Sequence, residues 1–163
     1  MRGKRLILIS HCVLNQNAVV RDWERAVGAY NDIAMVLLEQ DFGIVQLPCP
    51  EFSMLGEERP PLTWEEYDVP PYRTHCRELA AEPAKQIQEY VKKGYQIVGL
   101  LGIQESPSCD TTRKRGIFME ELLGLLAAAS IHLRTFDIPE SYRKGQPGDV
   151  LEQLRRFCNI ITE

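Results

Sequence analysis

The stretch YQIVGLLGI, residues 95–103, decides the fold because it is the most hydrophobic run of the chain. Its apolar residues follow one another without polar alternation, which is typical of a strand covered on both faces of its sheet. Three other segments are also predicted to be strands: KRLILIS at 4–10, GIVQLP at 43–48 and IHLRTFDI at 131–138. The sequence therefore predicts a sheet that lies between two other layers.

Helical segments separate these strands. Apolar residues at helical spacing predict helices at 30–41, 74–93, 116–130 and 148–161. We expect Pro83 to kink or restart the second of them, and we expect the proline-rich stretch 50–73 to form a loop excursion. Because strands and helices alternate, the predicted fold is a single α/β domain over residues 1–163. It is Rossmann-like, with three layers and a mostly parallel sheet that carries helices on both faces.

The composition narrows the class of protein. The 163 residues are 44% hydrophobic and 26% charged, and the net charge of −4 provides no basic field. This charge argues against binding to nucleic acid without an extra domain. No run reaches the about 18 apolar residues of a membrane span, and MRGKRLILIS lacks the long apolar stretch and cleavage site of a signal peptide. We therefore expect a cytoplasmic protein with no membrane partner.

The positions of the five cysteines point to a site. Reduced cytoplasmic thiols more often serve metal binding or catalysis than disulfides. Cys12, Cys49 and Cys109 each follow a predicted strand, and the carboxyl ends of parallel strands meet at one edge of a sheet, where ligands bind. We expect these three thiols to converge there. Cys76 and Cys158 fall on predicted helices, where small buried cysteines are common.

Three thiolates at one edge are compatible with two kinds of metal group. Zinc prefers tetrahedral sites with sulfur ligands, and iron–sulfur clusters are held by cysteine thiolates. The spacings of 37 and 60 residues contain no C-x-x-C pattern, so only the fold can assemble the ligands. Three cysteines on a four-iron cluster would leave one iron open, as a Lewis acid suited to a soft sulfur atom.

The cysteine motifs resemble those of the thiouracil desulfidase family. The resemblance lies in Cys12, the CPE of residues 49–51 and the SPSC of residues 106–109, and the GEERP of residues 56–60 is similar to later family positions. It covers roughly residues 4–137. It implies an α/β fold with a [4Fe-4S] cluster on the three cysteines. It also implies non-redox removal of sulfur from a thiolated pyrimidine base, nucleoside or nucleotide.

The chain departs from the family pattern at three places. Asn15 lies in a stretch where the family usually has glycine, Gln104 and Glu105 lie where it often has lysine, and Asp110 replaces a glycine after SPSC. These differences predict a divergent branch of the family. We do not expect the extra domain of its tRNA-acting relatives, so a small thiolated base or nucleotide is the expected partner.

Glu51 and Ser106 are the predicted catalytic residues. Glu51 follows Cys49 and Pro50, close to any bound metal, and a carboxylate there can act as a general base toward water or protonate the departing group. The alternative is a solvated loop acid. Pro107 favours an extended Ser106, which would aim this serine at the cluster, and the alternative is simple turn chemistry.

Asn15, Ser108 and Arg113 are the predicted substrate-binding residues. Asn15 could contact a pyrimidine edge, and Ser108 shares the turn of Cys109. Arg113 belongs to the basic run 112–115, which could meet a substrate phosphate or simply be a solvated loop. His11 borders Cys12 and is expected to donate a hydrogen bond at most.

The sequence therefore predicts an iron–sulfur-dependent desulfidase that cleaves a carbon–sulfur bond with water. Two alternatives use the same three cysteines. One is a zinc site, hydrolytic or structural, and the other is a non-enzymatic module that binds a small ligand in the sheet crevice.

Overall fold

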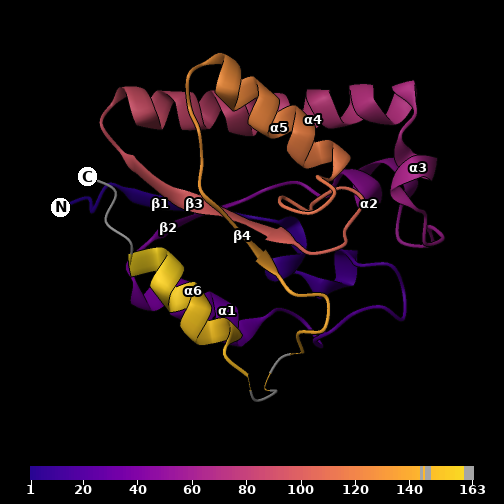
Figure 1. Ribbon diagram of the computed structural model, residues 1–163, viewed down its shortest axis with the longest axis horizontal. Helices are drawn as coiled ribbons and strands as arrows, with labels where there is room; N and C mark the ends of the chain where they lie inside the picture. The colour runs from indigo at the N-terminus through magenta and orange to yellow at the C-terminus, as the bar shows by residue number, and fades with distance from the viewer. Residues whose placement is uncertain (144, 146–147, 160–163) are drawn as a thin grey trace.

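Four strands form one parallel sheet (Figure 1). The structure is a computed structural model, and it describes residues 1–143, 145 and 148–159. The strands, in the order β2-β1-β3-β4 across the sheet, are β1 (Arg5–Ile9), β2 (Gly43–Gln46), β3 (Gln96–Ile103) and β4 (Thr135–Ile138). This order is that of flavodoxin-like doubly wound folds. The prediction of a parallel sheet is therefore confirmed.

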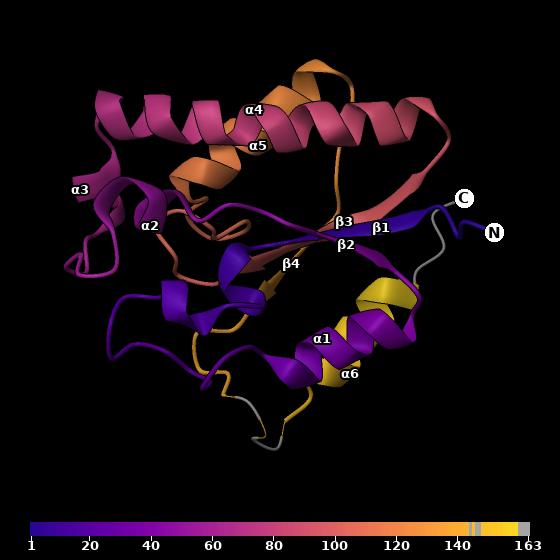
Figure 2. The same cartoon turned by 180° about the vertical axis from the view of Figure 1, so that it is seen from behind.

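Helices cover both faces of the sheet, as predicted. The helices are α1 (Asn31–Glu39), α2 (Pro50–Leu55), α3 (Trp64–Tyr67), α4 (Pro70–Lys92), α5 (Ile117–Ala128) and α6 (Val150–Asn159), with short 3-10 turns η1 (His11–Val13) and η2 (Gln16–Ala18). In Figures 1 and 2, α4 and α5 lie together on one side of the sheet, and α1 and α6 lie together on the other. The result is the three-layer α/β architecture that the strand and helix pattern predicts.

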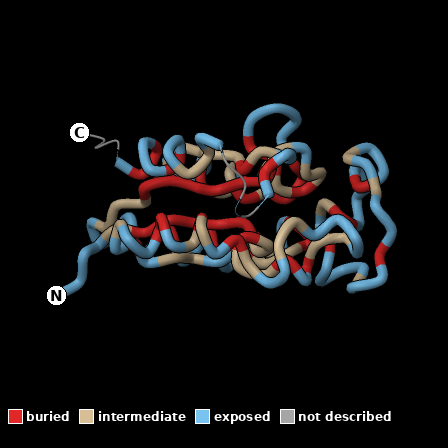
Figure 3. Tube along the Cα trace, turned by 90° about the horizontal axis from the view of Figure 1, so that it is seen from below, coloured by how far each residue is buried: buried red, intermediate tan, exposed pale blue. Residues whose placement is uncertain are grey.

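The pleat of β1 divides the core into two parts. Ile7 and Ile9 are fully buried among side chains of α1 and α6, whereas Leu8 is fully buried among those of α4 and α5. Successive side chains of a strand point to opposite faces, so a strand buried on both faces must be apolar throughout. Figure 3 shows buried residues along the strands and on the inner sides of the helices.

The prediction of a loop over residues 50–73 is wrong in its detail. This stretch holds α2, α3 and the first turn of α4. Its prolines begin helices rather than prevent them, because Pro50 and Pro70 occupy the first helical positions of α2 and α4. Proline is favoured there, since its missing N–H would have no helical partner in any case. Thr63 caps α3 through its side chain, which accepts the Glu66 N–H.

The remaining boundaries differ by a few residues. Pro83 does not restart a helix, because α4 runs unbroken through it and Pro83 is buried against the core. The last strand begins at Thr135 rather than at residue 131. Of the predicted helix 148–161, residues 150–159 are helical, and residues 160 and 161 lie outside the described part of the chain.

The carboxyl ends of the strands all open on one edge of the sheet. β2 follows β1 on one side, and β3 returns to the other side of β1, so the direction of winding reverses between β1 and β3. Ligands of open α/β sheets bind at such a reversal. Within the described residues, no helix has the length and apolar character that a membrane crossing requires.

Candidate functional site

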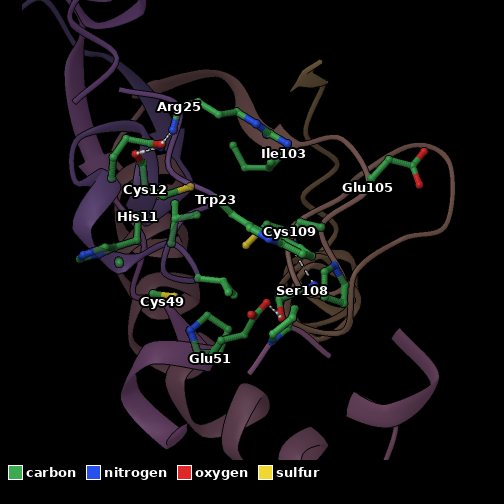
Figure 4. A pocket seen from close by; sticks show the side chains of 18 of the residues that line it. His11, Cys12, Trp23, Arg25, Cys49, Glu51, Ile103, Glu105, Ser108 and Cys109 are labelled. Atoms are coloured by element: carbon green, nitrogen blue, oxygen red, sulfur yellow. Dashed lines mark hydrogen bonds between the residues drawn. The ribbon is translucent and has the colours of Figure 1, made fainter. Parts of the chain in front are cut away.

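A cavity of about 160 Å³ lies at this edge, and all three predicted cysteines line it. Cys12 belongs to η1 after β1, Cys49 precedes α2 after β2, and Cys109 lies in the turn after β3 (Figure 4). The cavity is about ten times larger than the ~10–15 Å³ that one water requires. Cys76 and Cys158 are buried in α4 and α6 and do not line it. The fold thus assembles the three distant cysteines and separates the other two.

Local contacts aim the thiols of the two later cysteines. The Cys49 sulfur accepts the Phe52 N–H at 3.4 Å and so caps α2. The Cys109 carbonyl accepts the Ile103 N–H at 3.0 Å and folds the turn back onto the end of β3. Gly102 permits this approach, because a Cβ at that position would lie 2.5 Å from the Cys109 carbonyl oxygen.

The surroundings of the thiols oppose their ionisation. Burial, and after it the neighbouring Cys49 thiol, raise the pKa of Cys12 to about 12. Burial also raises the pKa of Cys49, and it raises that of Cys109 well above its usual value, with Cys12 and Cys49 as the next causes. Without a bound cation the three thiols therefore keep their protons at neutral pH. A metal group would replace those protons, since thiolate is the form that binds metals.

Glu51 is buried in a hydrogen-bonded network beside the cysteines. Its Oε1 accepts the Tyr67 hydroxyl at 3.1 Å and the Arg59 Nε–H at 3.4 Å, and its Oε2 accepts the Ser108 hydroxyl at 2.7 Å. Glu51 and Arg59 are 9% and 6% exposed, so the solvated loop acid considered from the sequence is wrong. A buried carboxylate needs such donors and an opposite charge to remain in the fold.

Ser108 links this network to α4. It donates its only hydroxyl hydrogen to Glu51, so the Tyr72 hydroxyl, 2.6 Å away, is the donor to Ser108. Ser108 is 1% exposed and lies against the cavity wall. Its hydroxyl is thus occupied by Glu51 and Tyr72. Its predicted contact with substrate stays a prediction.

Ser106 organises the Cys109 turn and lines the cavity. Its hydroxyl oxygen accepts the Cys109 N–H at 3.0 Å and the Ser108 N–H at 3.3 Å. This is the turn chemistry that the sequence offered as the alternative role. Both lone pairs of the hydroxyl are used, and its hydrogen is left to donate.

Two predicted substrate contacts lie outside the cavity lining. Asn15 caps η2 by accepting the Asn17 N–H, and its amide donates to the His11 imidazole at 3.4 Å. Arg113 is exposed and pairs with Glu105 at 3.0 Å. His11 lines the cavity and contacts the Leu47 carbonyl through Nδ1 at 3.2 Å. The structure therefore brings His11, but neither Asn15 nor Arg113, to the cavity wall.

Sequence reasoning missed several residues of the site. They belong to no recognisable sequence motif, and all but Gln16 come from segments farther from the cysteine motifs: Gln16, Trp23, Arg25, Tyr67 and Tyr72. Gln16 is buried at 3% exposure in a polar stretch, which gives no signal in the sequence. Trp23 is one of only two tryptophans, and its rarity is the signal that could have marked it.

The three cysteine thiols that line the cavity are ligands of the chemical type that a zinc ion or an iron–sulfur cluster requires. Within the described part of the chain, however, no three histidine, cysteine, aspartate or glutamate side chains are gathered closely enough to hold one metal ion. One zinc ion with bonds of about 2.3 Å to sulfur needs its ligand sulfurs within roughly 4 Å of one another. A multi-iron cluster takes thiolate ligands at several irons and spans more widely placed cysteines.

A comparison with known proteins finds one similar curated sequence. The uncharacterized protein MJ0003 of Methanocaldococcus jannaschii is 43% identical over 141 residues, which are 86% of this chain and 90% of that protein. The chain belongs to the MJ0003 family. No family model matches the chain, and no solved structure matches it. The name of MJ0003 states no activity, so membership in its family supplies no function, and the resemblance to thiouracil desulfidases stays a prediction.

Proposed function

We propose that this protein is an iron–sulfur-dependent desulfidase that hydrolyses a thiolated pyrimidine base, nucleoside or nucleotide. One observation carries the proposal. Three thiols from three strand ends line one cavity, and a buried carboxylate lies in the same wall. The resemblance of Cys12, CPE and SPSC to thiouracil desulfidases supports the same assignment. A cytoplasmic location fits, since it keeps these thiols reduced.

Cys12, Cys49 and Cys109 would hold a [4Fe-4S] cluster in this proposal. When bound, the cluster supplies an electrophilic iron that polarises the thiocarbonyl group of the substrate. Burial in the cavity disfavours isolated thiolates, as the raised pKa values of Cys12 and Cys109 show. Cluster binding is therefore coupled to the release of protons from these cysteines.

Glu51 positions and deprotonates the attacking water. An ionised carboxylate has about four acceptor sites, and Arg59, Tyr67 and Ser108 use three of those on Glu51. The remaining site, on Oε2, accepts a proton from water at the cavity wall. The fixed donors hold the carboxylate in one orientation, so little reorganisation is needed when the water reacts.

Ser106 has the complementary role of a donor. The backbone N–H groups of Ser108 and Cys109 donate to the Ser106 hydroxyl oxygen and fix the direction of this hydroxyl group. Its hydrogen then points to an acceptor on the substrate or to the departing sulfur. The reaction balances without electron transfer: the oxygen of water replaces sulfur on the carbon, the C=S bond becomes C=O, and both hydrogens of water leave as hydrogen sulfide.

Anaerobic reconstitution with iron and sulfide tests the proposal. We expect a brown protein with about four irons, as a cubane cluster requires, which releases sulfide from thiouracil or thiouridine compounds. Cys12→Ala, Cys49→Ala and Cys109→Ala should each lose both properties. Cys158→Ala is the matched control, because that buried thiol lies outside the cavity, and it should keep both. A colourless protein that binds zinc instead, or a brown one that releases no sulfide, would overturn the proposal.

A further inference from the structure

One wall of the cavity has no part in the proposed chemistry. It comes from residues 19–29, the segment between η2 and α1, which carries Trp23 and Arg25. Trp23 lines the cavity although it is 59% exposed. A large aromatic side chain that is half in solvent at the mouth of a cavity is suited to contact a ligand. Figure 4 shows Trp23 and Arg25 beside Cys12, Cys109 and Ile103.

This wall is tied directly to the turn of the first cysteine. Gln16 accepts the Arg25 N–H at 2.8 Å and donates to the Cys12 carbonyl at 2.8 Å. The backbone N–H of Trp23 donates to the Val20 carbonyl at 2.9 Å and closes a turn, with Asp22 in the left-handed region at φ 70°. Asp22 is not a glycine, so this conformation costs free energy. The backbone turn that carries Trp23 is therefore specified by the fold.

Arg25 places in the same wall a hydrogen-bond donor that has no acceptor in the described part of the chain. Its Nε is a buried side-chain nitrogen without a hydrogen-bond partner among the described residues. A buried donor without an acceptor is rare and destabilising. Arginine can only donate, so the group that would satisfy it is an oxygen or an unprotonated ring nitrogen.

We propose that this wall recognises the ring of the substrate: Trp23 stacks on its flat face and Arg25 donates to a ring carbonyl oxygen. The inference rests on the proposed function for the identity of the ring. Trp23 and Arg25 by themselves select a chemical class of ligand, a planar heteroaromatic ring with a carbonyl acceptor. The other lining residues near the mouth, Val20, Pro61 and Leu62, are apolar and suit the same flat surface.

Tryptophan fluorescence gives a readout that is independent of sulfide release. Trp64 lies outside the cavity, where its Nε1 donates to the Arg115 carbonyl at 3.0 Å. Trp64→Phe therefore leaves Trp23 as the only tryptophan of the chain. In the reconstituted W64F protein, we expect 4-thiouridine and 2-thiouracil to quench this emission to saturation. Quenching that never saturates would overturn stacking.

Trp23→Ala and Trp23→Phe then test the energetics, with W64F as the control. Stacking on one base corresponds to binding that weakens between about five-fold and a hundred-fold on truncation to alanine. We expect this rise in KM and in the calorimetric Kd for Trp23→Ala, with a smaller rise for Trp23→Phe and none for W64F. Because Trp23 is exposed, its replacement should leave the fold intact. An unchanged Kd for Trp23→Ala would overturn the proposal.

Arg25→Met tests the carbonyl contact. We expect the wild type to bind 2-thiouracil more tightly than a thiopyridone, which has the thiocarbonyl group but no ring carbonyl oxygen, by about ten-fold for a hydrogen bond to a charged donor. Arg25→Met should lose this preference and Arg25→Lys should keep part of it. A preference that survives in Arg25→Met would overturn the contact.

The outcomes separate this inference from the proposed function. If rings quench Trp23 and binding depends on Trp23 while no thiolated compound releases sulfide, the desulfidase proposal fails and ring recognition stands. If sulfide is released with the same KM and Kd in Trp23→Ala, ring recognition fails and the desulfidase proposal stands.

Discussion

Ser108 is the residue that joins the two later cysteine turns. It precedes Cys109, and it donates to Glu51, which lies two residues after Cys49. Tyr72 donates to Ser108 in turn and anchors the chain of bonds to α4. A buried chain of this kind holds its members more rigidly than isolated hydrogen bonds, because each bond polarises the next.

We predict that Ser108→Ala lowers the free energy of unfolding by on the order of 3 kcal/mol, because it leaves the buried Tyr72 hydroxyl without an acceptor and removes a charge-assisted bond to Glu51. Urea unfolding measures the change. Ser53→Ala is the control: it also removes a hydroxyl that contacts another side chain, His75, but on an exposed surface. A loss no greater for Ser108→Ala than for Ser53→Ala would show that the network does not stabilise the fold.

Which residues meet at the cavity could be predicted from the sequence only in part. The convergence of Cys12, Cys49 and Cys109 was predicted because each lies in the connection after a strand, and the ends of parallel strands meet at one edge of the sheet. The hydrogen-bonded network around Glu51 was not predicted, because Tyr67, which bonds Glu51, and Tyr72, which bonds Ser108, come from helices 16 and 21 positions after Glu51. Their hydroxyls meet the site only after α3 and α4 are placed.

At the scale of elements, the start of α5 supports the Cys109 turn. The Ile117 N–H bonds the Pro107 carbonyl at 2.9 Å and the Met119 N–H bonds the Ser108 carbonyl at 3.1 Å. The first N–H groups of a helix have no partner within it, so the turn satisfies them. Gly116 permits the contact, since a Cβ there would lie 2.1 Å from the Ser108 carbonyl carbon.

We predict opposite effects for two glycine substitutions in this element. Gly116→Ala should lower the free energy of unfolding by about 1–3 kcal/mol and weaken retention of the proposed cluster, because the turn must move to make room. Gly124→Ala, in the middle of α5 with open space around it, should raise stability by about 0.5–1 kcal/mol. Urea unfolding of both variants measures this. If both substitutions changed the free energy of unfolding by the same small amount, the Cys109 turn would accommodate the added methyl group without cost.

Elements with continuous apolar runs could be predicted from the sequence. Helices that begin at a proline could not. β3 was identified because its burial on both faces requires apolar residues throughout. α2 and the start of α4 were missed because proline usually marks a loop, whereas Pro50 and Pro70 occupy the first helical position, where proline is favoured. Pro83 was expected to disturb α4, but tertiary packing of its buried face overrides local propensity.

At the scale of the whole molecule, the fold buries two thiols in its helices, Cys76 and Cys158, and partly buries the three that line the cavity. Burial raises the pKa of all five cysteines, including Cys76 in α4, to about 12, and Cys158 in α6, to about 11, from a usual value of 9.0. The buried tyrosines shift in the same direction. The folded chain therefore holds protons that the unfolded chain releases, and this difference couples stability to alkaline pH.

We predict that the metal-free protein keeps a constant urea midpoint up to about pH 8 and loses stability as the pH rises from 9 toward 12. The sign follows from the raised thiol pKa values: in this window the unfolded state binds fewer protons than the folded state, so rising pH favours unfolding. The measurement is urea unfolding over a pH series with reductant and chelator. The double variant Cys76→Ala and Cys158→Ala, whose thiols lie outside the cavity, should decline less steeply than the wild type. Parallel declines would mean that these two thiols ionise as readily in the folded protein as in the unfolded chain.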